Sequence, residues 1–172
     1  MIEAPHRRPI RRERHGAPVH RIALVLLAML PAFLTGCGVS IPADPDGTLA
    51  SVRGGVLRVG VSAEPGLTEI GGGTPSGPLV EVTESFAASI DASISWTTGS
   101  EESLVRLLEE GRLDLAIGGF TDATPWSDRA GVTRGYPGVT GSDGRAIVVL
   151  VPLGENALLS ELERFLDAEV GA

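Results

Sequence analysis

The 172-residue sequence contains no lysine, a single cysteine, and three histidines that all lie within its first twenty residues. The rest of the chain therefore cannot assemble a Ser-His-Asp triad, a Cys-His pair, a Schiff-base lysine or an imidazole metal site. One cysteine also excludes an intrachain disulfide framework. We expect a protein that is not an enzyme and that holds no cofactor and no metal. Catalysis by carboxylates alone is the one chemistry that the composition leaves open.

The only cysteine, Cys37, ends an N-terminal segment that has the charge layout of an export signal. Six arginines precede an apolar run over residues 22–34: Arg7, Arg8, Arg11, Arg12, Arg14 and Arg21. The run meets Leu34-Thr35-Gly36-Cys37, which resembles the bacterial lipobox. This resemblance implies cleavage before Cys37 and a diacylglycerol on its thiol. We therefore expect a palmitate-bearing lipoprotein that is anchored in the cell envelope, on the periplasmic side of the inner or the outer membrane.

Two other interpretations of this segment are weaker. The apolar run is too short to span a bilayer comfortably, and Pro31 interrupts it. Arginine pairs would suit twin-arginine export, but the pattern that flanks them in such signals is absent. The expected organisation is a lipoprotein signal peptide over residues 1–36, a flexible tether over 37–55 that is rich in Gly, Pro, Ser and Asp, and one folded domain over 56–172.

Charge limits the partners of the mature chain. Residues 37–172 contain eight arginines and twenty acidic residues, a formal net charge of −12. Such an acidic protein repels nucleic acid phosphates, so a nucleic acid partner is not expected. The length suits one domain with a modest core.

Hydrophobic periodicity predicts alternating strands and helices from residue 56 onward. Strands are expected at residues 56–61, 93–97, 113–117 and 146–151. Helices are expected at 78–90, 100–111 and 155–170, where apolar residues recur every three or four positions. Residues 120–145 are expected to form a loop with one short helical turn at 125–130. This order predicts an α/β domain of three layers, with a mostly parallel sheet and helices on both faces.

The sequence contains three distinctive phrases: Gly55-Val56-Leu57-Arg58-Val59-Gly60, Gly77-Pro78-Leu79-Val80-Glu81-Val82, and the pattern L-x-x-G-x-L-D-L-x-I-G-G over residues 108–119. Together they resemble lobe 1 of the bacterial family 3 extracytoplasmic solute-binding proteins. That family serves ABC importers of amino acids and related small polar solutes. The resemblance implies a single lobe of a type II periplasmic-binding-protein-like fold.

The resemblance continues to the end of the chain, with one large omission. Residues 121–129 look like an elongated form of the T-x-x-R segment of the family, and 132–136 like its F-S-x-P-Y segment. Residues 152–159 are similar to the passage that returns to lobe 1. In the family a complete second lobe separates these last two segments, and here only residues 137–145 connect them. The second lobe, which closes over the solute in a two-lobe binder, is therefore missing.

Ligands of open α/β sheets usually bind beyond the carboxyl ends of the strands. By resemblance to T-x-x-R, Arg129 would hold a solute carboxylate in a bidentate ion pair, and Thr121 would supply a hydroxyl. Asp122 and Glu64 complete the expected ligand-binding set, although Glu64 would repel a carboxylate. The alternative for Arg129 is a solvated side chain that is paired with Asp128 or Asp122.

The sequence therefore predicts a noncatalytic, lipid-anchored, extracytoplasmic solute-binding-like protein. Its partners would be a small amino-acid-like or carboxylated solute, the membrane through the lipid on Cys37, and an ABC-type transporter or another envelope protein. A second hypothesis is a lipoprotein interaction or scaffold domain that keeps the fold without binding a solute. A third is a carboxylate-based hydrolase of envelope glycans.

Overall fold

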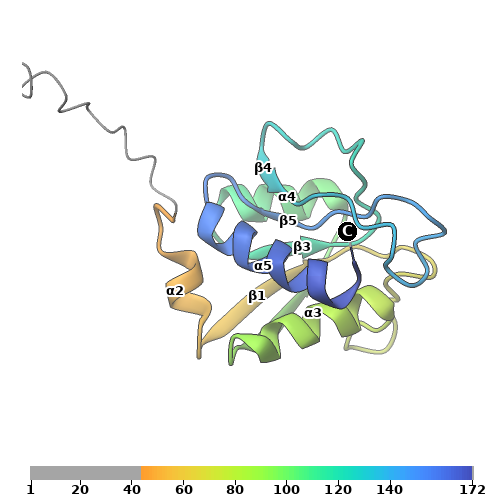
Figure 1. The fold of residues 1–172 in the computed structure, drawn as a ribbon, viewed down its shortest axis with the longest axis horizontal. Helices are drawn as coiled ribbons and strands as arrows, with labels where there is room; N and C mark the ends of the chain where they lie inside the picture. Colours follow the sequence, from red (N-terminus) through yellow and green to blue (C-terminus); the bar gives the residue numbers. More distant parts are fainter. Residues whose placement is uncertain (1–43, 172) are drawn as a thin grey trace, which may run out of the picture. The chain divides into compact units, whose positions relative to one another are not determined.

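The computed structural model describes residues 44–171 (Figure 1). The expected signal peptide and the expected lipidation site, Cys37, lie outside the described residues. The helices are α2 (Thr48–Val52), α3 (Pro78–Ser89), α4 (Glu101–Glu109) and α5 (Asn156–Glu169). The strands are β1 (Val56–Val61), β2 (Ser93–Thr98), β3 (Leu115–Ile117), β4 (Ala130–Val132) and β5 (Leu150–Pro152). None of the helices in this part of the chain has the length and the hydrophobicity that crossing a bilayer requires.

The five strands form one sheet in the order β2-β1-β3-β5-β4. β1 pairs in parallel with β2 and β3, whereas β5 is antiparallel to both β3 and β4. Four strands thus run in one direction and β5 runs against them. The sheet is parallel over β2, β1 and β3, as expected, and becomes mixed where β5 enters. We call the edge where β1, β2 and β3 end the carboxyl edge, and the opposite edge the amino edge.

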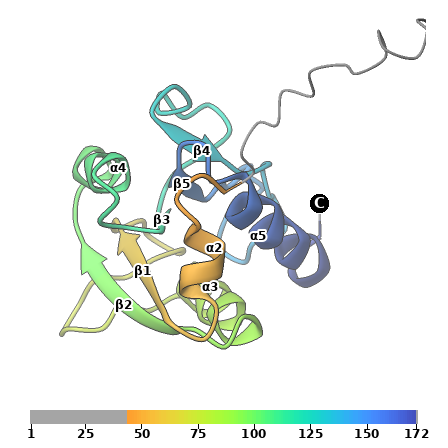
Figure 2. The same cartoon turned by 90° about the vertical axis from the view of Figure 1, so that its left-hand side faces the viewer.

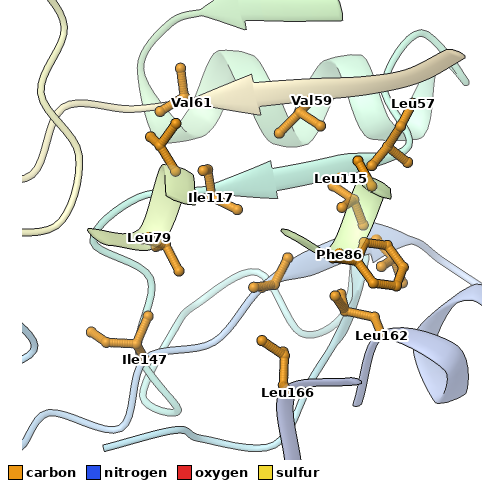
Figure 3. Packing of buried hydrophobic residues seen from close by; sticks show 14 of the residues in the cluster. Leu57, Val59, Val61, Leu79, Phe86, Leu115, Ile117, Ile147, Leu162 and Leu166 are labelled. Carbon is orange, nitrogen blue, oxygen red and sulfur yellow. The ribbon is translucent and has the colours of Figure 1, made fainter. Parts of the chain in front are cut away.

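Helices cover both faces of the sheet, which confirms the predicted three layers. Figure 2 shows α4 on one side of the strands and α3 and α5 on the other. The larger core, drawn in Figure 3, joins β1 and β3 to α3 and α5 through Leu57, Val59, Leu115, Phe86 and Leu162, among others. The smaller core lies under α4. The side chains that face these cores are the ones whose spacing predicted the helices.

Local sequence explains where the helices begin. Pro78 occupies the first turn of α3, where its missing N–H needs no partner. The Ser100 hydroxyl accepts a hydrogen bond from the backbone N–H of Ser103 at 3.4 Å, which caps α4. Glu101 and Glu102 then favour the positive end of that helix. These signals are local, so the sequence predicted both helices closely.

The expected tether is wrong in its second half, because α2 lies within it. Val52 is only 2% exposed and belongs to the larger core. The buried carboxylate of Glu155 accepts hydrogen bonds from the backbone N–H groups of Asp46, at 3.1 Å, and Thr48, at 3.2 Å. Glu155 thereby caps α2 from the other end of the chain. The folded part therefore begins before residue 56, because tertiary contacts with Glu155 and the larger core stabilise α2.

The segment between β3 and β5 also differs from the expectation of a simple loop. Residues 126–130 form the expected turn, in which the backbone N–H of Ala130 donates to the carbonyl of Trp126 at 2.9 Å. The edge strand β4 follows at once, although its three residues carry no periodic signal. The predicted strand over residues 146–151 is regular only at its end, as β5, while Ile147 makes isolated bridges to Thr121 and Tyr136.

Candidate functional site

The carboxyl edge brings together loops from distant parts of the chain. β1 ends at Val61, β2 at Thr98 and β3 at Ile117, so the loops that follow them meet at this edge. Glu64 lies in the first of these loops, and Thr121 and Asp122 lie in the third. Asp122 is tied to the approach to β5 by its backbone N–H, which donates to the carbonyl of Ala146 at 3.1 Å. Three of the four residues expected to bind a ligand thus belong to one edge.

Glu64 has a well-defined position at this edge. Its backbone makes two hydrogen bonds with Thr68, of 3.0 and 2.9 Å, which close a tight turn after β1. Its side chain lies against the backbone at the end of β3, because a Cβ added to Gly119 would stand 2.6 Å from Oε2 of Glu64. The Oε1 atom accepts a hydrogen bond of 2.7 Å from Nη1 of Arg145. An ion pair between distant loops therefore occupies the edge where a solute was expected.

Arg145 belongs to the loop of residues 137–145, which precedes the approach to β5. Ser142 organises this loop: its hydroxyl donates to the carbonyl of Pro137 at 2.8 Å, and its own carbonyl accepts from Nε of Arg145 at 3.0 Å. The loop packs directly on the loop after β1, because a Cβ on Gly141 would collide with the carbonyl oxygen of Gly66. Gly141 also has a φ of +83°, which favours glycine.

Arg129 lies away from the other three candidates. It precedes β4 at the amino edge, and its Nε and Nη2 donate to Oε1 and Oε2 of Glu109 at 2.7 and 2.5 Å. Glu109 ends α4, which runs from the carboxyl edge back to the amino edge. The hydrogen bonds between the two side chains raise the pKa of Arg129 and lower the pKa of Glu109. The guanidinium also stands 5.3 Å from the ring centroid of Trp126.

Arg129 is thus held in an ion pair, as the alternative prediction expected. Its partner, however, is Glu109 rather than Asp128 or Asp122. The structure does not bring Arg129 together with Glu64. Its role as a carboxylate clamp stays a prediction, and that role would require Arg129 to leave Glu109.

A hollow of about 450 Å³ lies at the amino edge, and its lining includes Arg58, Glu109, Asp114 and Arg129. The buried Asp114 carboxylate accepts from the backbone N–H of Arg58 at 2.8 Å and from its Nε and Nη2 at 3.0 and 2.5 Å. This pairing raises the pKa of Arg58. Both arginines of this amino-edge hollow are thus neutralised by carboxylates of the same chain, and neither presents an unpaired positive charge to a ligand.

The sequence did not indicate that Arg145 would lie at the carboxyl edge, nor that Asp114 would pair with Arg58. Arg145 sits in a segment of glycine, serine and aspartate that carries no periodicity, so no local signal in the sequence pointed to it. Asp114 is the aspartate of the L-D-L phrase, and its neighbour in space, Arg58, lies 56 positions earlier in the chain. Among residues 44–171 no three His, Cys, Asp or Glu side chains are grouped so that they could hold a metal ion.

Comparisons with known proteins identify the fold. No protein-family model and no curated protein sequence matches the chain. Domain 1 of TmArgBP, solved as a point mutant in its arginine-bound form, superposes with a TM-score of 0.61 at 19% identity, over 70% of this chain and 97% of that one. An ancestral arginine-binding protein bound to arginine gives 0.57 at 12% identity, over 68% and 92% of the two chains.

A Salmonella typhimurium periplasmic binding protein, described for its high arginine specificity, gives a TM-score of 0.56 at 14% identity, over 68% of this chain and 94% of that one. Identities this low carry information about the fold alone. The β2-β1-β3-β5-β4 sheet, the helices on both of its faces and these superpositions lead to one conclusion: the chain has the fold of a single lobe of a periplasmic binding protein.

Proposed function

We propose that this protein is a lipid-anchored, extracytoplasmic solute-binding-like protein that takes a small amino-acid-like or carboxylated solute at its carboxyl edge and serves an ABC-type transporter. The observation that carries the proposal is the pair of opposite charges at that edge, Glu64 and Arg145, in a fold that elsewhere binds amino acids. A zwitterionic solute needs one partner of each sign, and the edge offers a carboxylate and a guanidinium side by side.

The structural neighbours support binding by a single lobe. Domain 1 of TmArgBP is described in an arginine-bound form. The absence of a second lobe is therefore compatible with a bound solute in this fold. The neighbours of comparable fold are described as binding proteins, which favours binding over catalysis.

A thermal-shift panel on the purified full-length chain, with amino acids and small organic acids, tests the proposal. A solute present at a hundredfold excess over its Kd should raise Tm by roughly 8 °C, since it stabilises the folded state by about 2.7 kcal/mol. Glu64→Gln should reduce the shift, whereas the matched control Glu84→Gln, on the exposed side of α3, should not. Arg129→Ala tests the clamp in the same assay, and an unchanged shift would remove Arg129 from the site.

The second candidate function is an interaction or scaffold domain without a solute. Two contacts between loops at the carboxyl edge favour it: the Glu64–Arg145 ion pair and the close approach of the Gly141 and Gly66 backbones. If no solute in the panel moves Tm while cross-linking in intact cells repeatedly captures the same envelope protein, this function replaces the first.

The lipid anchor has its own test, independent of any solute. Cys37→Ser should abolish the incorporation of a labelled palmitate precursor and release the chain from the membrane fraction, because serine offers no thiol to the diacylglycerol transfer. Ser40→Ala, three residues further on, is the matched control and should keep both properties. Incorporation of the label by the Cys37→Ser chain would contradict the lipoprotein assignment.

A further inference from the structure

We propose that the Glu64 carboxylate is a binding site for the cationic group of a solute, a guanidinium or a primary ammonium, and that Arg145 occupies this site in the absence of solute. The inference rests on the proposed function and names the charge of the group that the carboxyl edge accepts. Arg145 is then an internal competitor that a solute has to displace.

The contact between Arg145 and Glu64 is a single hydrogen bond, from Nη1 to Oε1 at 2.7 Å. The other buried or bidentate arginine pairs of the chain are more extensive. Arg58 donates two side-chain hydrogen bonds to Asp114, and Arg129 donates two to Glu109. A single-point pair between partly exposed side chains is easier to replace than a bidentate one.

Glu64 retains binding capacity beyond its bond to Arg145. Within residues 44–171 no hydrogen bond is donated to its Oε2, which lies beside the Gly119 backbone. The side chain is 28% exposed, so the Glu64 carboxylate is only partly buried. An incoming guanidinium can therefore engage both oxygens, which the arginine of the loop does not do.

The loop of residues 137–145 holds Arg145 in place without burying it. The carbonyl of Ser142 accepts from both the backbone N–H and Nε of Arg145, each at 3.0 Å, while Ser142 itself is buried. The Arg145 side chain remains 38% exposed. Rotation of that side chain frees Glu64 while the Gly141 contact to Gly66 stays intact, so the exchange requires no movement of the loop backbone.

The strength of this competition can be bounded. An exposed ion pair contributes at most about 1 kcal/mol, which at 1.4 kcal/mol per tenfold corresponds to about fivefold in affinity. Removal of Arg145 should therefore tighten the binding of a cation by up to about fivefold. If the pair were purely structural, its removal would leave cation affinity unchanged or weaken it.

Titration calorimetry on the full-length chain with agmatine, a guanidinium compound without a carboxylate, tests this directly. We expect Arg145→Ala to bind agmatine up to about fivefold more tightly than the unmodified chain. Glu64→Gln should lose this binding, alone and in combination with Arg145→Ala. Arg112→Ala, which removes an exposed arginine from a single-hydrogen-bond pair with Glu110, is the matched control and should leave the affinity unchanged.

Each alternative result has a definite meaning. Equal or weaker agmatine binding by Arg145→Ala, or full binding by Glu64→Gln, overturns the inference. If no variant binds agmatine while a carboxylated solute still raises Tm in the panel, the inference fails and the proposed function stands. If neither agmatine nor any solute in the panel binds, both fail.

Discussion

Replacement of Asp114 by alanine is expected to lower the free energy of unfolding by about 3 kcal/mol. The Asp114 side chain is 2% exposed and accepts three hydrogen bonds from Arg58, one of them from the backbone N–H at the start of β1. Alanine leaves that N–H and the guanidinium without their acceptor and opens a small void beneath the amino edge of the sheet. Urea denaturation followed by circular dichroism measures the loss.

Two further variants separate the ion pair from a general effect of charge. Asp128→Ala removes an exposed carboxylate from the lining of the same amino-edge hollow and should change stability by less than about 0.5 kcal/mol. Asp114→Asn should fall between the two, because its amide oxygen still accepts from the backbone N–H of Arg58 but carries no charge. A loss below about 1 kcal/mol for Asp114→Ala would contradict the role assigned here.

That role bears on the resemblance to the solute-binding family. The L-D-L phrase is the most distinctive part of the resemblance, and its aspartate joins β1 to β3 at the amino edge, opposite the expected solute site. The aspartate of this motif therefore stabilises the sheet of the lobe, and its presence does not indicate a ligand. A chain can keep this motif and lose its solute, which is why the fold and the function need separate tests.

The sequence predicted those parts of the fold that depend on local signals. β1, α3, β2, α4 and α5 all appear where hydrophobic period, capping residues and charged first turns placed them. In β1, α3, α4 and α5 most of the residues that define the pattern are also buried, whereas in β2 Ile94 and Trp96 are only partly buried. The helix α4 is typical, with Leu104 and Leu108 in the smaller core and Ser100 as its cap.

The remaining features depend on contacts between distant segments and so left no local pattern. α2 is held by Glu155, more than one hundred positions away, and β4 is an edge strand of three residues. The location of Glu64, Thr121 and Asp122 at the carboxyl edge followed from the predicted order of the strands, while their role in binding stays a prediction. The position of Arg129 did not follow, because a longer segment after β3 carries it to Glu109.

Stability is expected to fall as the pH rises from about 10 to about 12, through the ionisation of Tyr136. Burial, together with a hydrogen bond of 3.1 Å from its hydroxyl to Asp167, raises the pKa of Tyr136 to about 12. The ordinary value in an unfolded chain is about 10. Because the folded value is the higher one, the stabilisation is complete below pH 10 and is lost as the phenol ionises on the way to pH 12. At about 1.4 kcal/mol per unit, the loss amounts to roughly 2 to 3 kcal/mol.

The composition reduces the number of other side chains that titrate in this pH range. Tyr136 is the only tyrosine and the chain has no lysine, so no other tyrosine or lysine side chain titrates between pH 10 and 12. Tyr136→Phe is the matched variant: it should cost about 1 kcal/mol at pH 8, where a hydrogen bond is lost, and show a nearly flat stability profile from pH 10 to 12. Urea denaturation at each pH, with phenolate absorbance recorded in parallel, makes the comparison. A decline of equal size in Tyr136→Phe would assign the alkaline loss to another part of the chain. A flat profile in Tyr136→Phe would establish that the ionisation of this one phenol, which is hydrogen-bonded to α5, causes the alkaline loss.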